Sequence, residues 1–319
     1  MVKRVLISLF IILVAGLAAC QPAPTMSPAP VPSATQILPS DTPPPAATAT
    51  AAITEQPSAT ATTTIETIRF AVIGDYGSGD INEASVAKMV RGWNPDIILT
   101  VGDNNYPLGE AASIDDNIGQ FYHSYISPYT GKYGAGADVN RFFPTLGNHD
   151  WYTKDASPYF KYFQLPGSER YYDFVWGPVH FFALDSDGNE PDGNTSDSVQ
   201  AKWLQSGLAA STSIWNIVYF HYPPYSSALH GSIAFMRWPF AQWGASAVIS
   251  GHDHTYERLL VDDIPYFVNG LGGGTIYDFN DPLPESIVRY NASFGAMLVT
   301  ASPTRILFEF YNRYGVLVD

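Results

Sequence analysis

Five short apolar segments of the chain each end in side chains that can bind a metal ion. The segments span 68–75, 96–103, 141–149, 215–221 and 245–254, and they end at Asp75, Asp103, Asn148, His221, and His252 with His254. Carboxylate, amide and imidazole groups without cysteine suit iron, zinc or manganese better than a thiolate cluster or an all-oxygen calcium site. The number of ligands exceeds what one ion needs, so the set predicts two ions that share a carboxylate.

The elements that carry these side chains have the pattern of an α/β fold. Continuous apolar runs bounded by glycine are typical of strands buried on both faces. The stretch 81–94 places apolar residues on one helical face between the first two runs, which predicts a βαβ unit, and 198–210 is expected to be a second helix. In open α/β sheets, sites lie beyond the carboxyl ends of the strands, so the five segments predict one shared site.

Taken singly, each of these residues has a simpler interpretation. A Gly-Asp pair after a strand usually forms a turn or a helix cap, and a single histidine is most often structural. The recurrence at five strand ends favours a site. After residue 254 the pattern changes to shorter strands, YFVNGL, AMLVTA and RILFEFY, and these predict a second, more antiparallel sheet.

Residues 65–319 are expected to form one domain of about 255 residues. The chain has 16 Lys and Arg against 30 Asp and Glu, a formal net charge of −14. This charge argues against nucleic acid as a partner, because nucleic-acid binding needs a basic face. It would also repel phosphate esters, unless bound metal ions supplied a local positive field.

The first 64 residues differ from the rest in composition. Residues 1–20 carry two cations, an apolar run and small residues before Cys20, which indicates a secretory signal. Its end, Leu17-Ala18-Ala19-Cys20, resembles the lipobox of bacterial lipoproteins, and the alternative is a plain signal peptide. Cys20 is the only cysteine, so the domain has no internal disulfide. Residues 21–64 hold ten of the 25 prolines and are expected to be a disordered tether. The sequence thus predicts export and a lipid anchor on Cys20 at the bacterial cell surface or the periplasmic face of a membrane.

Five motifs in order resemble the calcineurin-like metallophosphoesterases, and especially the small, tartrate-resistant type of purple acid phosphatase. They are GDYG (74–77), GDNNY (102–106), GNHD (147–150), FHYP (220–223) and GHDHTYER (251–258). The resemblance covers about 68–310 and implies two mixed β-sheets packed as a sandwich between helices, a four-layer α/β/β/α fold. Most of the broader family has Asp-x-His in the first motif, whereas this chain has Gly77. The GDxxY pattern of the purple acid phosphatases supplies a tyrosine instead, here Tyr106.

The resemblance also implies the site residues. The first ion, expected to be Fe(III), would be bound by Asp75, Asp103, Tyr106 and His254, and the second, a divalent Fe, Zn or Mn, by Asp103, Asn148, His221 and His252. His149 and His230 would act near the leaving group. For the other polar residues of these motifs we expect structural roles: Tyr76 packs beside the metals, Asp150 fixes its turn or orients a ligand, and Asp253 points away. His123, His180 and Asp185 are expected to be structural or supporting.

The function implied is hydrolysis of small phosphate monoesters by a metal-bound hydroxide, as in an acid phosphatase. Two alternatives remain open at this stage. The same two-metal site could serve a phosphodiesterase or pyrophosphatase, or the protein could be a non-catalytic surface lipoprotein that binds metal or phosphate.

Overall fold

The computed structural model describes residues 66–319. The predictions for 1–20 and 21–64, including the lipid anchor on Cys20, lie outside the described residues. Within 66–319, the helices are too short or too polar for any of them to cross a membrane.

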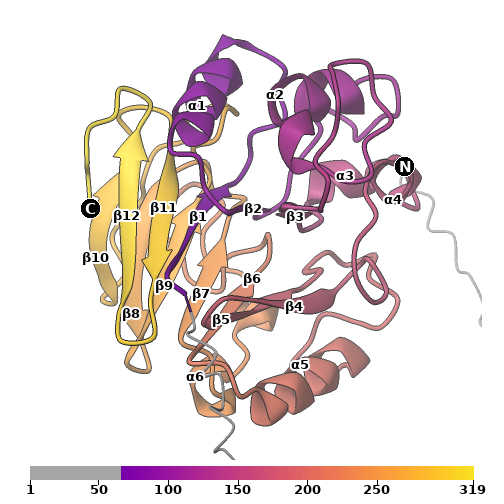
Figure 1. Ribbon diagram of the computed structural model, residues 1–319. Coiled ribbons are helices and arrows are strands. Elements are labelled where there is room, and N and C mark those ends of the chain that lie inside the picture. Colours follow the sequence, from indigo (N-terminus) through magenta and orange to yellow (C-terminus); the bar gives the residue numbers. More distant parts are fainter. Residues whose placement is uncertain (1–65) are drawn as a thin grey trace, which may run out of the picture. The chain divides into compact units, whose positions relative to one another are not determined.

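A five-stranded sheet forms one half of the domain (Figure 1). Its strands, in spatial order, are β12 (Ile306–Asn312), β11 (Gly295–Ala301), β1 (Ile68–Ile73), β2 (Ile97–Thr100) and β3 (Phe142–Pro144). The pairs β1–β2 and β2–β3 are parallel, and β11 and β12 are antiparallel to their neighbours. All four residues of β2 are buried, as expected of a central strand of a sheet covered on both faces.

A seven-stranded sheet forms the other half. Its order is β10 (Ser286–Tyr290), β8 (Tyr256–Val261), β9 (Ile264–Asn269), β7 (Ala247–Ser250), β6 (Trp215–Tyr219), β5 (Val179–Ala183) and β4 (Tyr172–Trp176). The four central strands β9, β7, β6 and β5 are parallel, and the outer ones are antiparallel.

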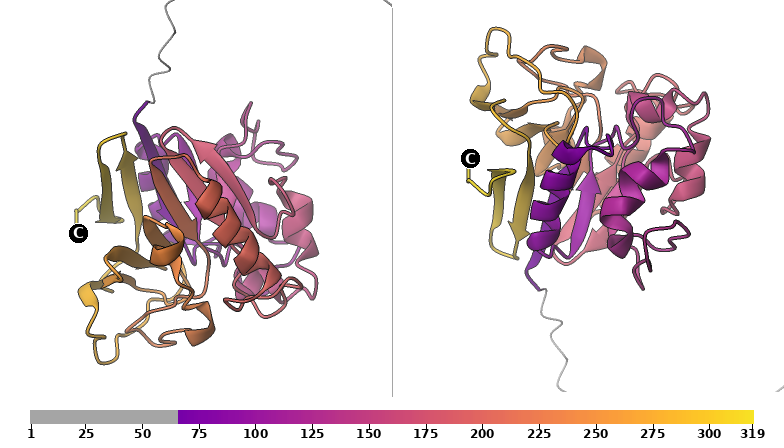
Figure 2. Two further views of the ribbon diagram at one scale, coloured as in Figure 1. Left: turned by 90° about the horizontal axis from the view of Figure 1, so that it is seen from below. Right: turned by 90° about the horizontal axis from the view of Figure 1, so that it is seen from above.

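Helices cover the outer faces of the two sheets (Figure 2). On the five-stranded side lie α1 (Ile81–Gly92), a π-helical turn (Asp115–Gly119), α2 (Gln120–Tyr122), a 3-10 turn (His123–Tyr125), α3 (Asn148–Trp151) and α4 (Ser157–Tyr162). On the seven-stranded side lie α5 (Val199–Ala210), a 3-10 turn (Ala234–Met236) and α6 (Phe240–Trp243). The four-layer α/β/β/α fold implied by the sequence is therefore confirmed.

The alternation of side chains along the seven-stranded sheet divides the core into two parts. Phe181 and Ile217 face the other sheet, and Phe181 meets Phe70 of β1 edge-on with ring centroids 5.0 Å apart. Their neighbours Phe182 and Val218 face α5 and α6. Because successive strand residues point to opposite faces, one apolar run fills both layers of the core.

One prediction about strand pairing was wrong. The last three predicted strands do not form a sheet of their own: β11 and β12 extend the sheet of β1, and β9 pairs in parallel with β7. The five strands that lead to the site are divided between the two sheets, with β1, β2 and β3 in one and β6 and β7 in the other. Strand partners are set by packing between distant segments, which an apolar run does not encode.

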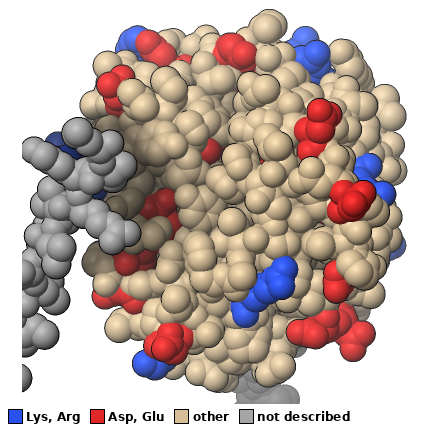
Figure 3. Space-filling view, turned by 180° about the vertical axis from the view of Figure 1, so that it is seen from behind, with Lys and Arg blue, Asp and Glu red and all other residues tan. Residues whose placement is uncertain are grey.

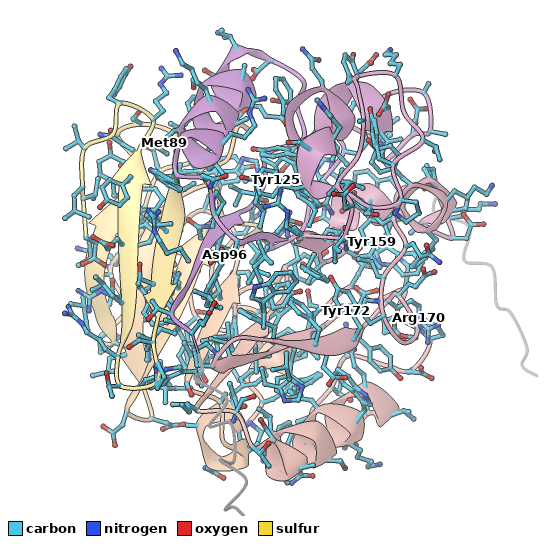
Figure 4. All side chains as sticks on the ribbon, in the orientation of Figure 1. Met89, Asp96, Tyr125, Tyr159, Arg170 and Tyr172 are labelled. Atoms are coloured by element: carbon cyan, nitrogen blue, oxygen red, sulfur yellow. The ribbon has the colours of Figure 1, made fainter. Side chains whose placement is uncertain are left out.

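A pair of buried tyrosines fixes the short strand that leads to the GNHD loop. Tyr159 of α4 and Tyr172 of β4 both donate to the carbonyl oxygen of Pro144, over 2.8 and 2.6 Å (Figure 4).

On the face shown in Figure 3, Lys and Arg of the described chain lie singly among Asp and Glu and form no continuous basic patch.

Candidate metal centre

Three of the predicted ligands lie on backbone bent sharply at the end of a strand. Asp75 follows β1 with φ of 54°, Asp103 follows β2 with φ of 54°, and His252 follows β7 with φ of 70°. This left-handed region is uncommon for residues other than glycine, and such conformations concentrate at functional sites. The bends turn the side chains into the space where the two sheets meet.

The first group of ligands gathers around the phenol of Tyr106. Donor atoms of Asp75, Asp103 and His254 all lie within 4.8 Å of one another. The Tyr106 hydroxyl lies 3.0 Å from Asp103 Oδ2, 3.0 Å from His254 Nε2 and 3.4 Å from Asp75 Oδ1. These four side chains form one compact cluster, in agreement with the set expected for the first ion.

The second group adjoins the first through Asp103. His221 Nε2 lies 3.5 Å from Asp103 Oδ1, 3.0 Å from Asn148 Oδ1 and 3.3 Å from His252 Nδ1. Asp103 thus offers one oxygen to each group, which is the arrangement that a bridging carboxylate needs. The structure brings together all seven residues predicted as ligands, from the ends of five strands.

The hydrogen bonds of the histidines fix one proton on each ring. His221 Nδ1 lies 2.9 Å from the Val101 carbonyl oxygen, and His254 Nδ1 lies 2.5 Å from that of Thr275. Each Nδ1 therefore carries a proton, and each Nε2 has a lone pair whenever the ring is neutral. The neutral His221 ring then presents that lone pair to the side-chain oxygens of Asn148 and Asp103. Such acceptors repel unless a proton or a metal cation lies between them, so the residues present fit metal ions.

The pKa shifts in the cluster also indicate that it needs positive charge. Burial raises the pKa of the Tyr106 phenol well above its ordinary value, and Asp103 and Asp75 raise it further. For His221, burial works to lower the pKa, but Asp103 and Asp75 outweigh it and raise the pKa. Burial and the neighbouring histidines lower the pKa of His252 to about 2, which keeps that ring neutral and able to bind a metal. Cations in the centre would replace the protons that the carboxylates otherwise attract.

The position of Gly77 has no room for a side chain. A Cβ there would overlap the backbone carbonyl of Asn104, in the loop that carries Tyr106. The same loop is joined to Gly77 by a hydrogen bond of 2.7 Å from the Tyr106 N–H to the Gly77 carbonyl oxygen. A histidine at position 77 and this placement of Tyr106 are therefore sterically exclusive.

His149 and His230 both lie beside the ligand cluster. The Nδ1 of His149 contacts the Pro107 carbonyl oxygen at 2.6 Å, so its Nε2 is free and lies 3.9 Å from Asp103 Oδ2. The His230 ring stacks on His252 with centroids 4.4 Å apart. Both line a cavity of about 150 Å³ together with several ligands.

The remaining polar residues of the motifs support the loops. Asp150 accepts hydrogen bonds from the Gly147 N–H and from the backbone and side chain of Asn104. Asp253 points away from the cluster and accepts the N–H groups of His230 and Gly231. The other bonds are as follows: Tyr76 to Asn104, Trp151 to Asp185, His123 to the Gly119 carbonyl, and His180 to Asp173 and Ser211.

Two residues near the centre were not predicted from the sequence. Asn104 joins the first three motif loops, since its side chain bonds Tyr76, the Thr145 carbonyl and Asp150. Tyr277 stacks on His254 with ring centroids 4.2 Å apart and an interplanar angle of 8°. The adjacent asparagines of GDNNY could have indicated the first, but the loop that holds Tyr277 matches none of the quoted motifs.

The fold agrees with comparison to known proteins. The family model described as calcineurin-like phosphoesterase matches residues 68–256, and the chain belongs to this family. Its curated relatives include acid phosphatases. Tartrate-resistant acid phosphatase type 5 of Rattus norvegicus is 26% identical over 260 residues, covering 68% of this chain and 74% of the relative. The Homo sapiens protein of the same name is 25% identical over 259 residues, covering 67% and 74%.

Two solved structures share the fold. A purple acid phosphatase from yellow lupin superposes with a TM-score of 0.63 at 18% identity, covering 80% of this chain and 53% of its own. This chain therefore spans about half of the lupin protein. Plasmodium GAP50, described as the anchor in the inner membrane complex, has a TM-score of 0.60 at 18% identity, covering 79% and 87%. Family and relatives together support a metal-dependent phosphoester hydrolase that is homologous to acid phosphatases.

Proposed function

We propose that the protein hydrolyses phosphate monoesters with two metal ions in this centre. The first, Fe(III), would be held by Asp75, Asp103, Tyr106 and His254, and the second, a divalent Fe, Zn or Mn, by Asp103, Asn148, His221 and His252. The observation that carries the proposal is the convergence of potential ligands, with His221 Nε2 3.0 Å from Asn148 Oδ1 and 3.5 Å from Asp103 Oδ1. Two cations bound there would supply the positive field that attracts a phosphate and makes a water molecule acidic.

The chain's own residues would orient the ester and move a proton. The Nδ1 of His149 is held by the Pro107 carbonyl, so the Nε2 faces the centre and, when the ring is doubly protonated, can deliver a proton to the departing alcohol. The Asp103 carboxylate fixes the backbone of the same residue, since it accepts the His149 N–H over 2.9 Å. His230, stacked on His252, would contact the phosphate side of the substrate.

The acidic composition favours a site in which the metal ions bind the phosphate and the side chains orient the ester and move the proton. With a net charge of −14, the chain itself would repel a phosphate dianion, so its affinity for the ester must come from the ions. We propose further that the domain works outside the cytoplasm, anchored by lipid on Cys20. The support for this location is the lipobox-like sequence alone.

A binding protein without turnover is the second candidate. It is favoured by the likeness in fold to Plasmodium GAP50, which is described as an anchor. The position of His149 argues against it here, because a scavenger of metal or phosphate has no need of a proton donor beside the centre.

Hydrolysis of p-nitrophenyl phosphate by the purified domain and by Asp103→Asn and His252→Ala tests the proposal. We expect both variants to lose activity by at least about a hundredfold while circular dichroism stays unchanged. Asp197→Asn, in the exposed loop before α5, is the matched control and should keep full activity. Full activity in Asp103→Asn would refute the two-metal centre, and faster turnover of bis-p-nitrophenyl phosphate would assign a phosphodiesterase instead.

A further inference from the structure

Two cavities meet at the ligand cluster. The smaller, of about 150 Å³, is lined by metal-binding side chains with His149, Tyr152, His230 and Tyr277. The larger, of about 380 Å³, is lined by Ser78 and Asp80 between the GDYG motif and α1, by the start of α1 and by the loop 273–277. His149, His254 and Tyr277 line both, so the two cavities are adjacent.

The shared residues indicate which part of a substrate each cavity would hold. The smaller cavity is lined by several of the proposed metal ligands and has room for a phosphate group. The proton donor His149 lies at the junction, so the ester oxygen that it protonates must lie there too, and the alcohol beyond that oxygen extends into the larger cavity. This assignment rests on the proposed function.

We propose that the larger cavity is a leaving-group subsite that selects aromatic groups without negative charge. Three of its lining residues are aromatic: Tyr106, Tyr277 and Phe294. Tyr277 is fixed by its stacking on His254, and the Arg313 guanidinium lies over the Phe294 ring at 5.2 Å from its centroid. Gly273 and Gly274 bring backbone without side chains to the same cavity. A flat ring gains both buried area and aromatic contact between such walls.

The charge of the cavity determines the second half of the proposal. Among its lining residues, Asp80 carries a negative charge, and no Lys or Arg belongs to them. The Asp80 carboxylate is held in place by the N–H groups of Asn82 and Glu83 and by the Ser78 hydroxyl. Arg313 is not among the lining residues, and its guanidinium donates to Asn82 over 2.9 Å. A leaving group that carries a carboxylate or a second phosphate is therefore repelled, and a cationic one is attracted.

A series of para-substituted phenyl phosphates of similar reactivity tests the subsite. We compare kcat/KM for the 4-(aminomethyl), 4-(hydroxymethyl) and 4-(carboxymethyl) compounds, with glycerol 2-phosphate as the aliphatic reference. The wild type should prefer them in that order, with about tenfold between the cationic and the anionic compound. Asp80→Asn keeps a good helix cap and should reduce that spread to about twofold. Phe294→Leu should lower kcat/KM for the aryl esters about tenfold and that for glycerol 2-phosphate much less.

Asp197→Asn, which lines neither cavity, is the control and should behave as the wild type. Equal rates along the charge series in the wild type, or an unchanged spread in Asp80→Asn, would overturn the subsite. Binding of the matching aryl phosphonates by calorimetry separates this from the proposed function. If no ester is hydrolysed but the phosphonates bind in the same charge order, the hydrolase proposal fails and the subsite stands.

Discussion

The backbone N–H of Tyr106 donates to the carbonyl oxygen of Gly77 over 2.7 Å, so the residue that lacks a ligand side chain directly positions the tyrosine proposed as a ligand. A Cβ at position 77 would overlap the Asn104 carbonyl in the same loop. The absence of a histidine and the presence of the tyrosine are thus a single structural feature of this chain.

Gly77→Ala is therefore expected to destabilise the domain by about 2–3 kcal/mol, because the added methyl group must displace the Tyr106 loop. It should also lower the affinity for the first ion. Denaturant unfolding and metal titration measure the two effects. Gly92→Ala is the matched control, since that position at the end of α1 has open space, and it should be neutral or slightly stabilising. Equal stability of the two variants would contradict the steric argument.

Tyr106→Phe removes the hydroxyl but keeps the ring, which contacts the His149 ring with centroids 4.5 Å apart. If the first ion is Fe(III) bound by tyrosinate, the wild type absorbs visible light and the variant loses that band. The variant should keep its fold by circular dichroism. A band that survives the substitution would show that Tyr106 is not the ligand that produces it.

His149→Gln tests proton donation to the leaving group. Because alkoxides are poor leaving groups, we expect turnover of glycerol 2-phosphate to fall about a hundredfold, and that of p-nitrophenyl phosphate to fall much less. His180→Gln serves as the control, since His180 bonds Asp173 and Ser211 away from the centre. The same loss for both substrates would indicate that His149 positions the phosphate rather than delivers a proton.

The buried carboxyl of Glu83 should make the stability of the domain depend on pH, independently of any bound metal ions. Burial raises the pKa of this carboxyl well above its ordinary value, although the Gly79 N–H opposes the shift. The unfolded chain releases the proton at a lower pH than the folded one, so this contribution to stability is present below about pH 4 and is lost as pH rises through the folded-state pKa. With metal removed by chelation, Glu83→Gln should raise the free energy of unfolding at pH 8 by on the order of 1 kcal/mol, with little change at pH 4.

The exposed Glu110 provides the control for that measurement, since Glu110→Gln should change the free energy of unfolding little at either pH. If Glu83→Gln also follows the wild type between pH 4 and 8, the buried carboxyl is not the source of the dependence.

The sequence predicted the seven side chains that gather at the centre, but not Tyr277, Asn104 or the arrangement of the strands. Asp75, Asp103 and His221 follow apolar runs whose ends are visible in the sequence, and α1 and α5 begin and end within two residues of the prediction. The pairing of β11 with β1 joins segments more than 220 residues apart, and no local pattern encodes it.

Tyr277 was missed for a similar reason. It reaches the centre through the loop after β9, where Gly272 and Gly274 bond the carbonyls of Gly74 and Asp75. Only the packing of the two sheets brings that loop to the end of β1. The resemblance to a family supplied the two-sheet fold that periodicity alone could not.

The two-metal centre is tested most directly by elemental analysis and hydrolysis of p-nitrophenyl phosphate on the same preparation, as metal is removed and restored. We expect two ions per chain, one of them iron, loss of activity on chelation, and recovery only as the second equivalent binds. Full activity with fewer than two ions, or two bound ions without hydrolysis of any phosphate ester, would contradict it.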